Sequence, residues 1–109
     1  MISKIVIKEK MNQISGKHCS PVEVARVNDQ VVRMCFVDGE FHWHKHSDFD
    51  ELFYVLSGEL AIQFEDMPDV ILSEGEMLVV TKGVKHCPKS VKPTFVLLFE
   101  PYDLKTDGD

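Results

Sequence analysis

The amino-acid sequence predicts an all-β fold in which short antiparallel strands form a sandwich or a barrel. Six segments are short, rich in β-branched and aromatic residues, and bounded by turn residues, namely 31–36, 51–56, 60–64, 70–72, 77–80 and 95–99. Gly-Glu pairs at Gly39, Gly58 and Gly75 separate several of these segments. Glycine adopts positive φ at little cost, and Asp38-Gly39 is the strongest hairpin signal in the chain. Many short strands at regular spacing favour a sandwich or barrel.

The two ends of the chain are expected to lie outside this sheet. Ile7, Met11 and Ile14 recur at helical spacing, so residues 5–14 are predicted to form a short helix, with a strand as the alternative. Residues 102–109, after Pro101, are mostly polar and are expected to be loosely held. With 109 residues the chain can build one core but not a second, and we expect a single domain over residues 1–109.

Composition and charge exclude several classes of function. Hydrophobic residues make up 44% and charged residues 28%, which argues against disorder. The net charge is −6 and there are only two arginines, so we expect no nucleic-acid surface, which would need clustered cations. Lys4 and Lys8 interrupt the first apolar stretch, and longer apolar runs are too short to span a bilayer, so we expect a cytoplasmic protein without a membrane partner. Three scattered cysteines without C-x-x-C fit reduced thiols.

Two of the predicted strands are apolar on both faces. Residues 51–56 read E-L-F-Y-V-L and residues 95–99 read F-V-L-L-F. A closed barrel would leave one face of each strand in water, so the second face needs a cover. Either the N-terminal segment or another subunit could supply it, and we expect a homodimer.

Residues 41–46, F-H-W-H-K-H, place a histidine at every second position. On a helix, residues two apart point in nearly opposite directions, whereas on a strand they share one face about 7 Å apart. A strand would therefore bring His42, His44 and His46 onto one face. Neighbouring imidazoles there can lean onto one ion about 2.0–2.2 Å from each nitrogen. The alternative is a solvated, histidine-rich strand without a metal.

Longer spacings extend this stretch into two motifs. Residues 39–58 read G-x4-H-x-H-x4-E-x6-G, and residues 75–90 read G-x5-T-x-G-x2-H-x3-S. They resemble the two motifs of the cupin superfamily, G-x5-H-x-H-x3,4-E-x6-G and G-x5-P-x-G-x2-H-x3-N. The first gap is one residue short, Thr81 replaces proline and Ser90 replaces asparagine, but no ligand position is lost. More narrowly, the chain is similar to small single-domain cupins labelled mannose-6-phosphate-isomerase-like.

This resemblance implies a cupin-type double-stranded β-helix, a jelly-roll barrel, with a metal site. The positions that correspond to the cupin metal ligands are His44, His46, Glu51 and His86. Three neutral imidazoles and one carboxylate suit a divalent first-row metal and leave positions for water, substrate or dioxygen. We expect one ion of Fe, Mn, Ni or Zn, and the ligand set does not decide between them. A cupin that has lost its metal remains an alternative.

Other residues near the motifs receive less specific interpretations. His42 points inward but lies outside the cupin ligand set, so we expect a buried, hydrogen-bonded histidine behind the ligands rather than a fifth ligand. Trp43 is expected to pack on the opposite face, with an interface role as the alternative. Asp50 is expected in a surface turn, His18 on the surface, and Cys87 in the core as a small packing residue. Four lysines near the second motif form a solvated rim that could attract an anionic substrate: Lys82, Lys85, Lys89 and Lys92.

The interior of the barrel is expected to be apolar with one charged corner. The direction shared with Glu51 turns Phe53 and Val55 inward, and neighbouring strands can contribute Met34, Phe36, Ile62, Phe64, Met77 or Val79. Such a cavity fits a small organic acid, enol or phenol better than a sugar phosphate, which would need inward arginines.

Two functions remain open at this point. The first is a metal-dependent enzyme of oxygenase, isomerase or lyase type, in which the ion stabilises developing negative charge. Glu51 is occupied by the metal, so His42 is the only candidate general base. The second is a non-catalytic binding module that acts as a sensor or carrier. No serine lies in a nucleophile elbow and no Gly-rich phosphate loop is present, which removes those enzyme classes.

Overall fold

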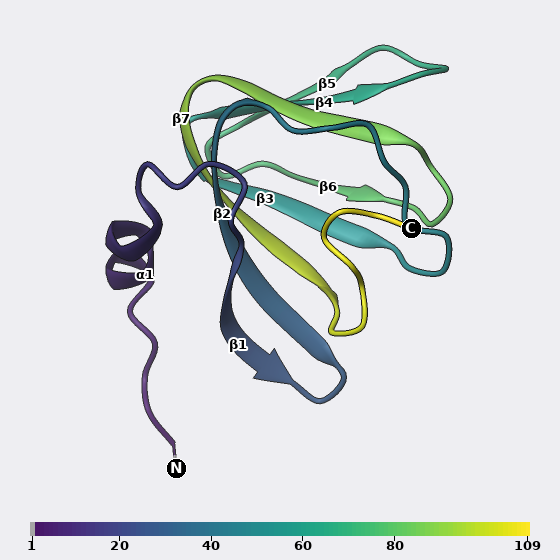
Figure 1. Cartoon of the computed structure of the whole chain (residues 1–109). Coiled ribbons are helices and arrows are strands. Elements are labelled where there is room, and N and C mark those ends of the chain that lie inside the picture. Colours follow the sequence, from purple (N-terminus) through teal and green to yellow (C-terminus); the bar gives the residue numbers. More distant parts are fainter. Residues whose placement is uncertain (1) are drawn as a thin grey trace.

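The computed structural model describes residues 2–109, and its strands form a sheet that curls on itself beside one short helix (Figure 1). In chain order the elements are α1 (Ile7–Ile14), β1 (Val22–Val27), β2 (Gln30–Glu40), β3 (Glu51–Ser57), β4 (Glu59–Phe64), β5 (Val70–Ser73), β6 (Met77–Val80) and β7 (His86–Pro101). The all-β prediction is confirmed, and the N-terminal segment forms the helix rather than the alternative strand.

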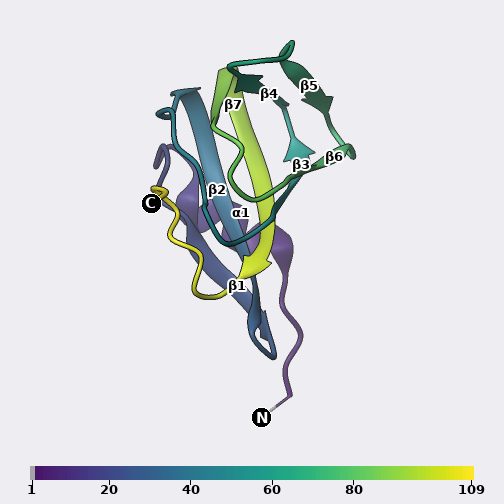
Figure 2. The same ribbon diagram turned by 90° about the vertical axis from the view of Figure 1, so that its right-hand side faces the viewer.

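The long strand β7 holds the two layers together. Along one edge it pairs antiparallel with β2, and along the other its first part pairs with β4 and its later part with β3. The strand order is β1-β2-β7-β3-β6, with β4 and β5 branching from β7. Because a single strand serves two successive partners on one edge, the sheet must bend there, and Figure 2 shows β7 running beside β2 through both layers. This bend encloses the barrel interior.

The interior is lined by alternate residues of the strands. In β3 the side chains of Phe53 and Val55 point inward, and Val96 and Leu98 of β7 do the same. Ile62 is also buried in this cluster, and Phe64 packs against it. Burial of these side chains removes apolar surface from water and supplies the main driving force for closing the barrel.

Four of the six residues that neighbouring strands could have contributed to the interior face away from it. Met34 and Phe36 belong to a second cluster beneath α1, because the helix covers the outer face of β2 and buries both faces of that strand. Met77 and Val79 of β6 are half exposed. The alternate residues of the same strands, such as Cys35 and Val37, face the interior.

Two turn and strand predictions are wrong. Gly39 does not form a hairpin, since it lies inside β2 at φ 118°, where a β-bulge shifts the register between Val37 and Gly39. Positive φ was correctly expected, but a bulge uses it rather than a turn. The histidine segment, residues 41–50, is an irregular loop between β2 and β3, with one isolated bridge at His44. Strand β1 and the first half of β7 carry no strong strand pattern and were not predicted.

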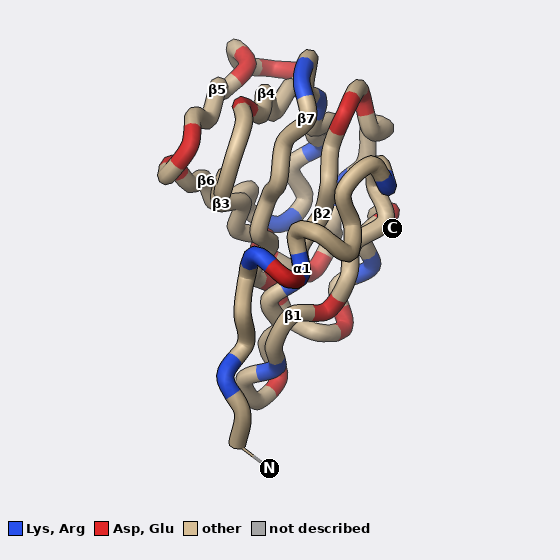
Figure 3. The backbone as a smooth tube through the Cα atoms, turned by 90° about the vertical axis from the view of Figure 1, so that its left-hand side faces the viewer, with Lys and Arg blue, Asp and Glu red and all other residues tan. Residues whose placement is uncertain are grey.

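The outer surface is mixed in charge and partly apolar. In Figure 3 the Lys and Arg positions are scattered along the tube, and acidic residues mark the turns around β5. The outer face of β6, β3 and β7 exposes Met77, Val79 and Phe99, which α1 does not cover. The expected homodimer therefore stays a prediction that this face motivates. Among the residues described, no helix has the length and apolarity to cross a membrane.

Candidate metal centre

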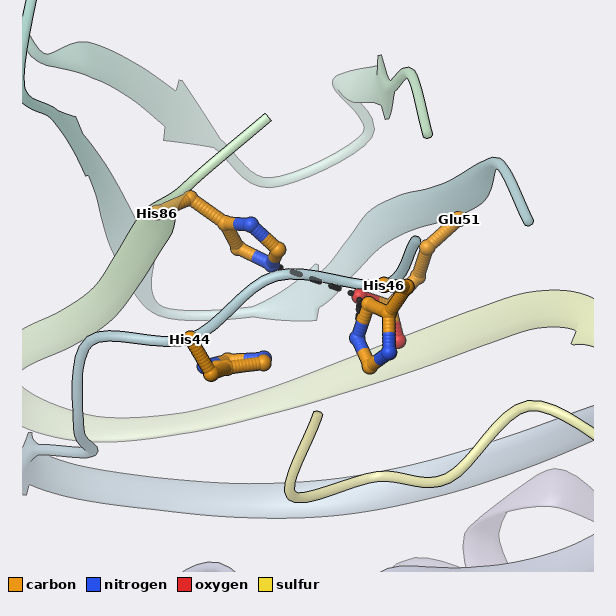
Figure 4. A group of neighbouring side chains, drawn as sticks. All are labelled: His44, His46, Glu51 and His86. Carbon is orange, nitrogen blue, oxygen red and sulfur yellow. Dashed lines mark ion pairs between the residues drawn. The ribbon is translucent and has the colours of Figure 1, made fainter. Parts of the chain in front are cut away.

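Four side chains from three parts of the chain meet at one end of the barrel (Figure 4). His44 and His46 come from the loop of residues 41–50, Glu51 begins β3, and His86 begins β7. One nitrogen or oxygen of each lies within 4.8 Å of the corresponding atoms of the other three. Their exposed fractions are 9%, 3%, 3% and 0%, so water reaches the cluster poorly. The structure thus brings together all four residues of the predicted ligand set.

Backbone hydrogen bonds fix the two histidine-bearing segments against each other. The His44 N–H donates to the His86 carbonyl at 3.0 Å, and the His86 N–H donates back to His44 at 2.8 Å. Near it, the Gly83 N–H donates to the His46 carbonyl at 2.8 Å. A single bridge and one turn contact therefore replace the full strand ladder that the alternating histidines predicted.

The ring nitrogens are arranged so that lone pairs face the cluster. Nδ1 of His44 donates to the His42 carbonyl at 2.8 Å, and Nδ1 of His86 donates to the Val84 carbonyl at 2.9 Å. Each neutral ring then presents an unprotonated Nε2, and such backbone contacts are typical behind metal-ligating histidines. His46 has no such partner.

Several buried polar atoms at this site lack a hydrogen-bond partner. A metal ion could bind the lone pairs of these atoms instead. These atoms are His46 Nδ1, His46 Nε2, Glu51 Oε1 and His86 Nε2. Glu51 Oε1 lies 3.3 Å from His46 Nε2 and 3.5 Å from His86 Nε2. Donors bound to one ion at 2.0–2.2 Å lie at most about 4.4 Å apart, so small side-chain shifts would close the group onto an ion. Buried polar groups without partners are rare, and the donor set fits a first-row metal.

Burial also sets the charges of the ligand groups. It lowers the pKa of His44 to about 4, and the neighbouring His86 and His46 add to this effect. Burial alone would raise the pKa of Glu51, but the adjacent ring nitrogens of His46 and His86 outweigh it and hold the pKa well below its usual range. Near neutral pH His44 is thus a neutral donor and Glu51 an anion, the states that metal ligands need.

A second buried carboxyl lies behind Glu51. Glu100, 1% exposed, receives a hydrogen bond from Arg33 Nη1 to its Oε2 at 2.5 Å, and its Oε1 has no partner. Burial and the adjacent Glu51 raise the pKa of Glu100 to about 9. Two neighbouring buried carboxyls resist double ionisation, and Arg33 offsets part of this effect on Glu100.

An apolar cavity of about 40 Å³ adjoins the cluster. Its wall is formed by apolar and weakly polar residues together with two of the candidate ligands: Cys19, Pro21, Cys35, Val37, Phe41, His44, Glu51, Phe53, Leu60, Pro88, Val96, Leu98 and Thr106. No lysine or arginine occurs in this described wall. The free space holds only a few water molecules, so a ring-sized occupant would require part of the wall to move.

The remaining sequence candidates lie mostly on the surface. His42 is exposed and its Nε2–H donates to the Asp107 carbonyl at 3.0 Å, so the expectation of a buried histidine behind the ligands is wrong. Its backbone carbonyl accepts the His44 Nδ1–H, and its ring centre lies 5.1 Å from that of His44. Trp43, expected to pack on the opposite face, is 39% exposed. The loop does not keep strand alternation, and this explains why His42 does not point inward.

Three other interpretations agree with the structure. Asp50 is exposed and its Oδ1 accepts a hydrogen bond from the Lys82 N–H at 2.8 Å, as a surface turn residue would. His18 is exposed and its Nδ1 accepts from the Asp38 N–H at 2.9 Å. Cys87 is fully buried. Most of the rim lysines are exposed, as expected.

Sequence reasoning missed two features of the site. The Arg33–Glu100 pair could have been found from Val96 and Leu98, because the same alternation carries Glu100 inward. Nothing in the polar pattern of residues 102–109 indicated that they pack beside the site. Leu104 is 3% exposed and Thr106 lines the cavity, so parts of this segment pack against the rest of the molecule.

The fold and the site place the chain among known proteins. Residues 32–99 match the model of the Cupin domain. The chain is 38% identical over 95 residues to the uncharacterized protein YdbB of Bacillus subtilis (strain 168), covering 87% of this chain and 83% of that protein. A cupin-2 domain protein from Shewanella frigidimarina NCIMB 400 superposes with a TM-score of 0.83 at 38% identity, over 89% and 93% of the two chains.

A more distant relative has a named activity. The chain is 25% identical over 111 residues to the 3-hydroxyanthranilate 3,4-dioxygenase of Bos taurus. The match covers 94% of this chain but only 38% of that enzyme, so less than half of the relative's length is represented. From the domain match, the relative in Bacillus and the shared fold, the chain belongs to the cupin family.

Proposed function

We propose that this cupin is a metal-dependent enzyme that acts on a small, mainly apolar molecule carrying a phenolic or enolic oxygen. The observation that supports it is the set of buried donor atoms without partners, which borders an apolar cavity. The named activity of the distant relative, a dioxygenase, favours the oxygenase type among the enzyme types open to a cupin. We propose His44, His46, Glu51 and His86 as the ligands of one divalent ion.

Different residues would bind the metal and contact the substrate. His44 and His86 present Nε2 lone pairs because their Nδ1 atoms are held by backbone carbonyls, and Glu51 contributes the negative charge. A divalent metal held there would supply Lewis-acid stabilisation of a substrate oxygen anion and, if redox-active, reactivity toward dioxygen. The apolar wall, with Phe53 and Leu98, would hold the carbon skeleton and exclude water.

The described wall of the cavity offers no free general base. His42 was the only candidate general base in the sequence, but its exposed ring lies on the surface and donates to Asp107. Within the described cavity wall, Glu51 is the only carboxylate, and the metal would occupy it. A substrate that is already an anion, or that gives its proton to water as it binds, fits this arrangement, because no residue of the described wall is free to accept the proton. Glu100 Oε1 can hold a proton behind Glu51.

Elemental analysis tests the metal, using protein purified without a nickel column. The wild type is expected to carry about one first-row metal per chain, and the His44→Ala, His86→Ala double variant is expected to carry none. Iron would direct the substrate screen to catechols, phenols and enols under air. Equal metal contents in the two proteins, or no metal in the wild type after reconstitution, would refute the site.

A non-catalytic binding module is the second candidate, favoured by the small cavity and the absence of a free base in its described wall. A metal-loaded protein that binds catechol without consuming dioxygen would support this function over the oxygenase.

Cytoplasmic location and a homodimer remain predictions. Light scattering at micromolar concentration tests the dimer, and a single monomeric mass would contradict it.

A further inference from the structure

Residues 102–109, called the strap below, leave β7 and return across the molecule to the loop that carries His44 and His46 (Figure 1). Arg33 holds the first residues of the strap. Nη2 of Arg33 donates to the Tyr102 carbonyl at 3.0 Å, and Nη1 of Arg33 donates to the Leu104 carbonyl at 3.2 Å. Arg26 stacks over the Tyr102 ring, 3.6 Å from its centre. These contacts anchor one end of the strap to the β1–β2 hairpin.

The far end of the strap is tied to the histidine loop. The Ser47 hydroxyl donates to Asp109 Oδ1 at 2.6 Å, and the Ser47 N–H donates to the same oxygen at 3.1 Å. The Asp109 N–H donates to the Lys45 carbonyl at 3.0 Å. His42 Nε2–H donates to the Asp107 carbonyl at 3.0 Å, which explains the orientation of its exposed ring. Strap and loop therefore hold each other.

Between these anchors the strap touches the candidate ligand His44. Gly108 has φ +87°, and a Cβ on it would lie 2.7 Å from His44 Cβ and 2.8 Å from the Lys45 carbonyl oxygen. Only a glycine allows the backbone to approach His44 so closely. Two residues earlier, Thr106 forms part of the cavity wall beside His44.

We infer that the strap is part of the metal centre and that Gly108 positions the candidate ligand His44. The inference rests on the proposed metal site. His44 lies on a loop with a single backbone bridge, so its ring needs support from outside the sheet. The strap supplies that support by packing on the ring and by holding His42, whose carbonyl accepts the His44 Nδ1–H.

The test compares Gly108→Ala with Gly75→Ala. Both glycines have nearly the same positive φ, +87° and +85°, but a Cβ at Gly75 meets nothing within 4 Å. The two variants therefore carry a similar backbone penalty, and only the first pushes against His44. Zn²⁺ affinity is measured by competition with a chromogenic chelator. We expect Gly108→Ala to weaken zinc binding on the order of tenfold, and Gly75→Ala to bind as the wild type does.

A second measurement needs no metal. Trp43 is the single tryptophan, and it lines a surface hollow together with Asp107, Gly108 and Asp109. In the metal-free protein, Gly108→Ala is expected to raise acrylamide quenching of Trp43 about twofold, as displacement of the strap uncovers the indole. Gly75→Ala should leave quenching unchanged.

The outcomes separate this inference from the proposed function. If the wild type binds no zinc, the metal site fails and the inference fails with it; Trp43 quenching then reports only whether the strap packs on the histidine loop. If the wild type binds zinc and Gly108→Ala binds equally well, the strap inference is wrong and the metal site stands. If Gly108→Ala does not fold, Ser47→Ala is used instead. It removes the hydroxyl that holds Asp109, at the far end of the strap, without straining the backbone. Zinc affinity in that variant equal to the wild type would likewise overturn the inference.

Discussion

The four candidate ligands rest on two kinds of support. Glu51 and His86 begin β3 and β7, where neighbouring strands fix the backbone through regular pairing. His44 and His46 lie on an irregular loop with one bridge, and their support comes from the strap and from single hydrogen bonds. The difference teaches that the strand half of the site depends on the stability of the barrel, whereas the loop half can be disturbed while the barrel stays folded.

The largest expected effect comes from breaking the strand half at Gly58. A Cβ there would overlap Thr94 Oγ1 and lie 2.8 Å from the Pro93 carbonyl oxygen, and the residue has φ +98°. Thr94 is fully buried and its hydroxyl bonds Glu59. Gly58→Ala is expected to lower the free energy of unfolding by about 3 kcal/mol in urea titrations. Gly75→Ala carries the strain of a positive φ without the overlap, so its free energy of unfolding should fall by only about 1 kcal/mol. Equal losses of stability in the two variants would contradict the steric argument.

Arg33 joins the two halves, so its replacement should affect both. Lysine keeps the charge but cannot reproduce the fork that reaches Glu100 and the Tyr102 and Leu104 carbonyls. Arg33→Lys is expected to destabilise the protein by about 1–2 kcal/mol and to weaken zinc binding several-fold. Arg26→Lys is the comparison variant: it weakens the stacking on Tyr102 and the hydrogen bond to the Asn28 carbonyl but leaves Glu100 and the strap carbonyls bound, so its effect should be smaller. A loss of stability without any change in zinc affinity would show that the strap anchor does not reach the site.

The sequence predicted the strand half better than the loop half, for physical reasons. Alternation places Glu51, Phe53 and Val55 on one face, and a sheet enforces that period of two. The same rule could not orient Met34 and Phe36, because β2 is buried on both faces and hydrophobicity does not distinguish its inner face from its outer face.

The loop could be predicted only through family resemblance. Alternation of histidines suggested a strand that does not exist, yet the cupin spacing still named four residues that lie together. The strap was not predicted because backbone carbonyls, a glycine and isolated side chains such as Leu104 and Asp109 make its contacts, and these leave no hydrophobic period in the sequence.

The loop half also predicts a pH dependence. His44 has a folded pKa of about 4, below the ordinary value of 6.5, so between these values the unfolded chain binds more protons. Stability due to this group is complete above pH 6.5 and is lost as the pH falls toward 4. Glu100, with its raised pKa, acts in the opposite direction in part of this range. The contribution of His44 is therefore isolated by comparing the wild type with a variant that lacks this imidazole but keeps Glu100.

Metal-free wild type and His44→Gln should be unfolded in urea at pH 7 and pH 4.5. The wild type is expected to lose about 1–2 kcal/mol more than the variant, less than the full shift would give because solvent still screens the ring. Identical pH slopes for the two proteins would mean that His44 is not desolvated as the structure indicates.

The smallest expected effect concerns the junction of the two halves at Asp50. Its Oδ1 accepts the Lys82 N–H at 2.8 Å and so links the residue before Glu51 to the turn that leads to His86. Asp50→Ala should cost about 0.5–1 kcal/mol of stability, the value of one exposed side-chain hydrogen bond. Asp48→Ala, a change at an exposed carboxylate on the same loop, is the control and should be neutral. Because the bond joins the loop to the His86 turn, zinc affinity should fall about twofold to threefold. A larger fall than for Gly108→Ala would reverse the ranking, making the turn rather than the strap the main support of the loop half.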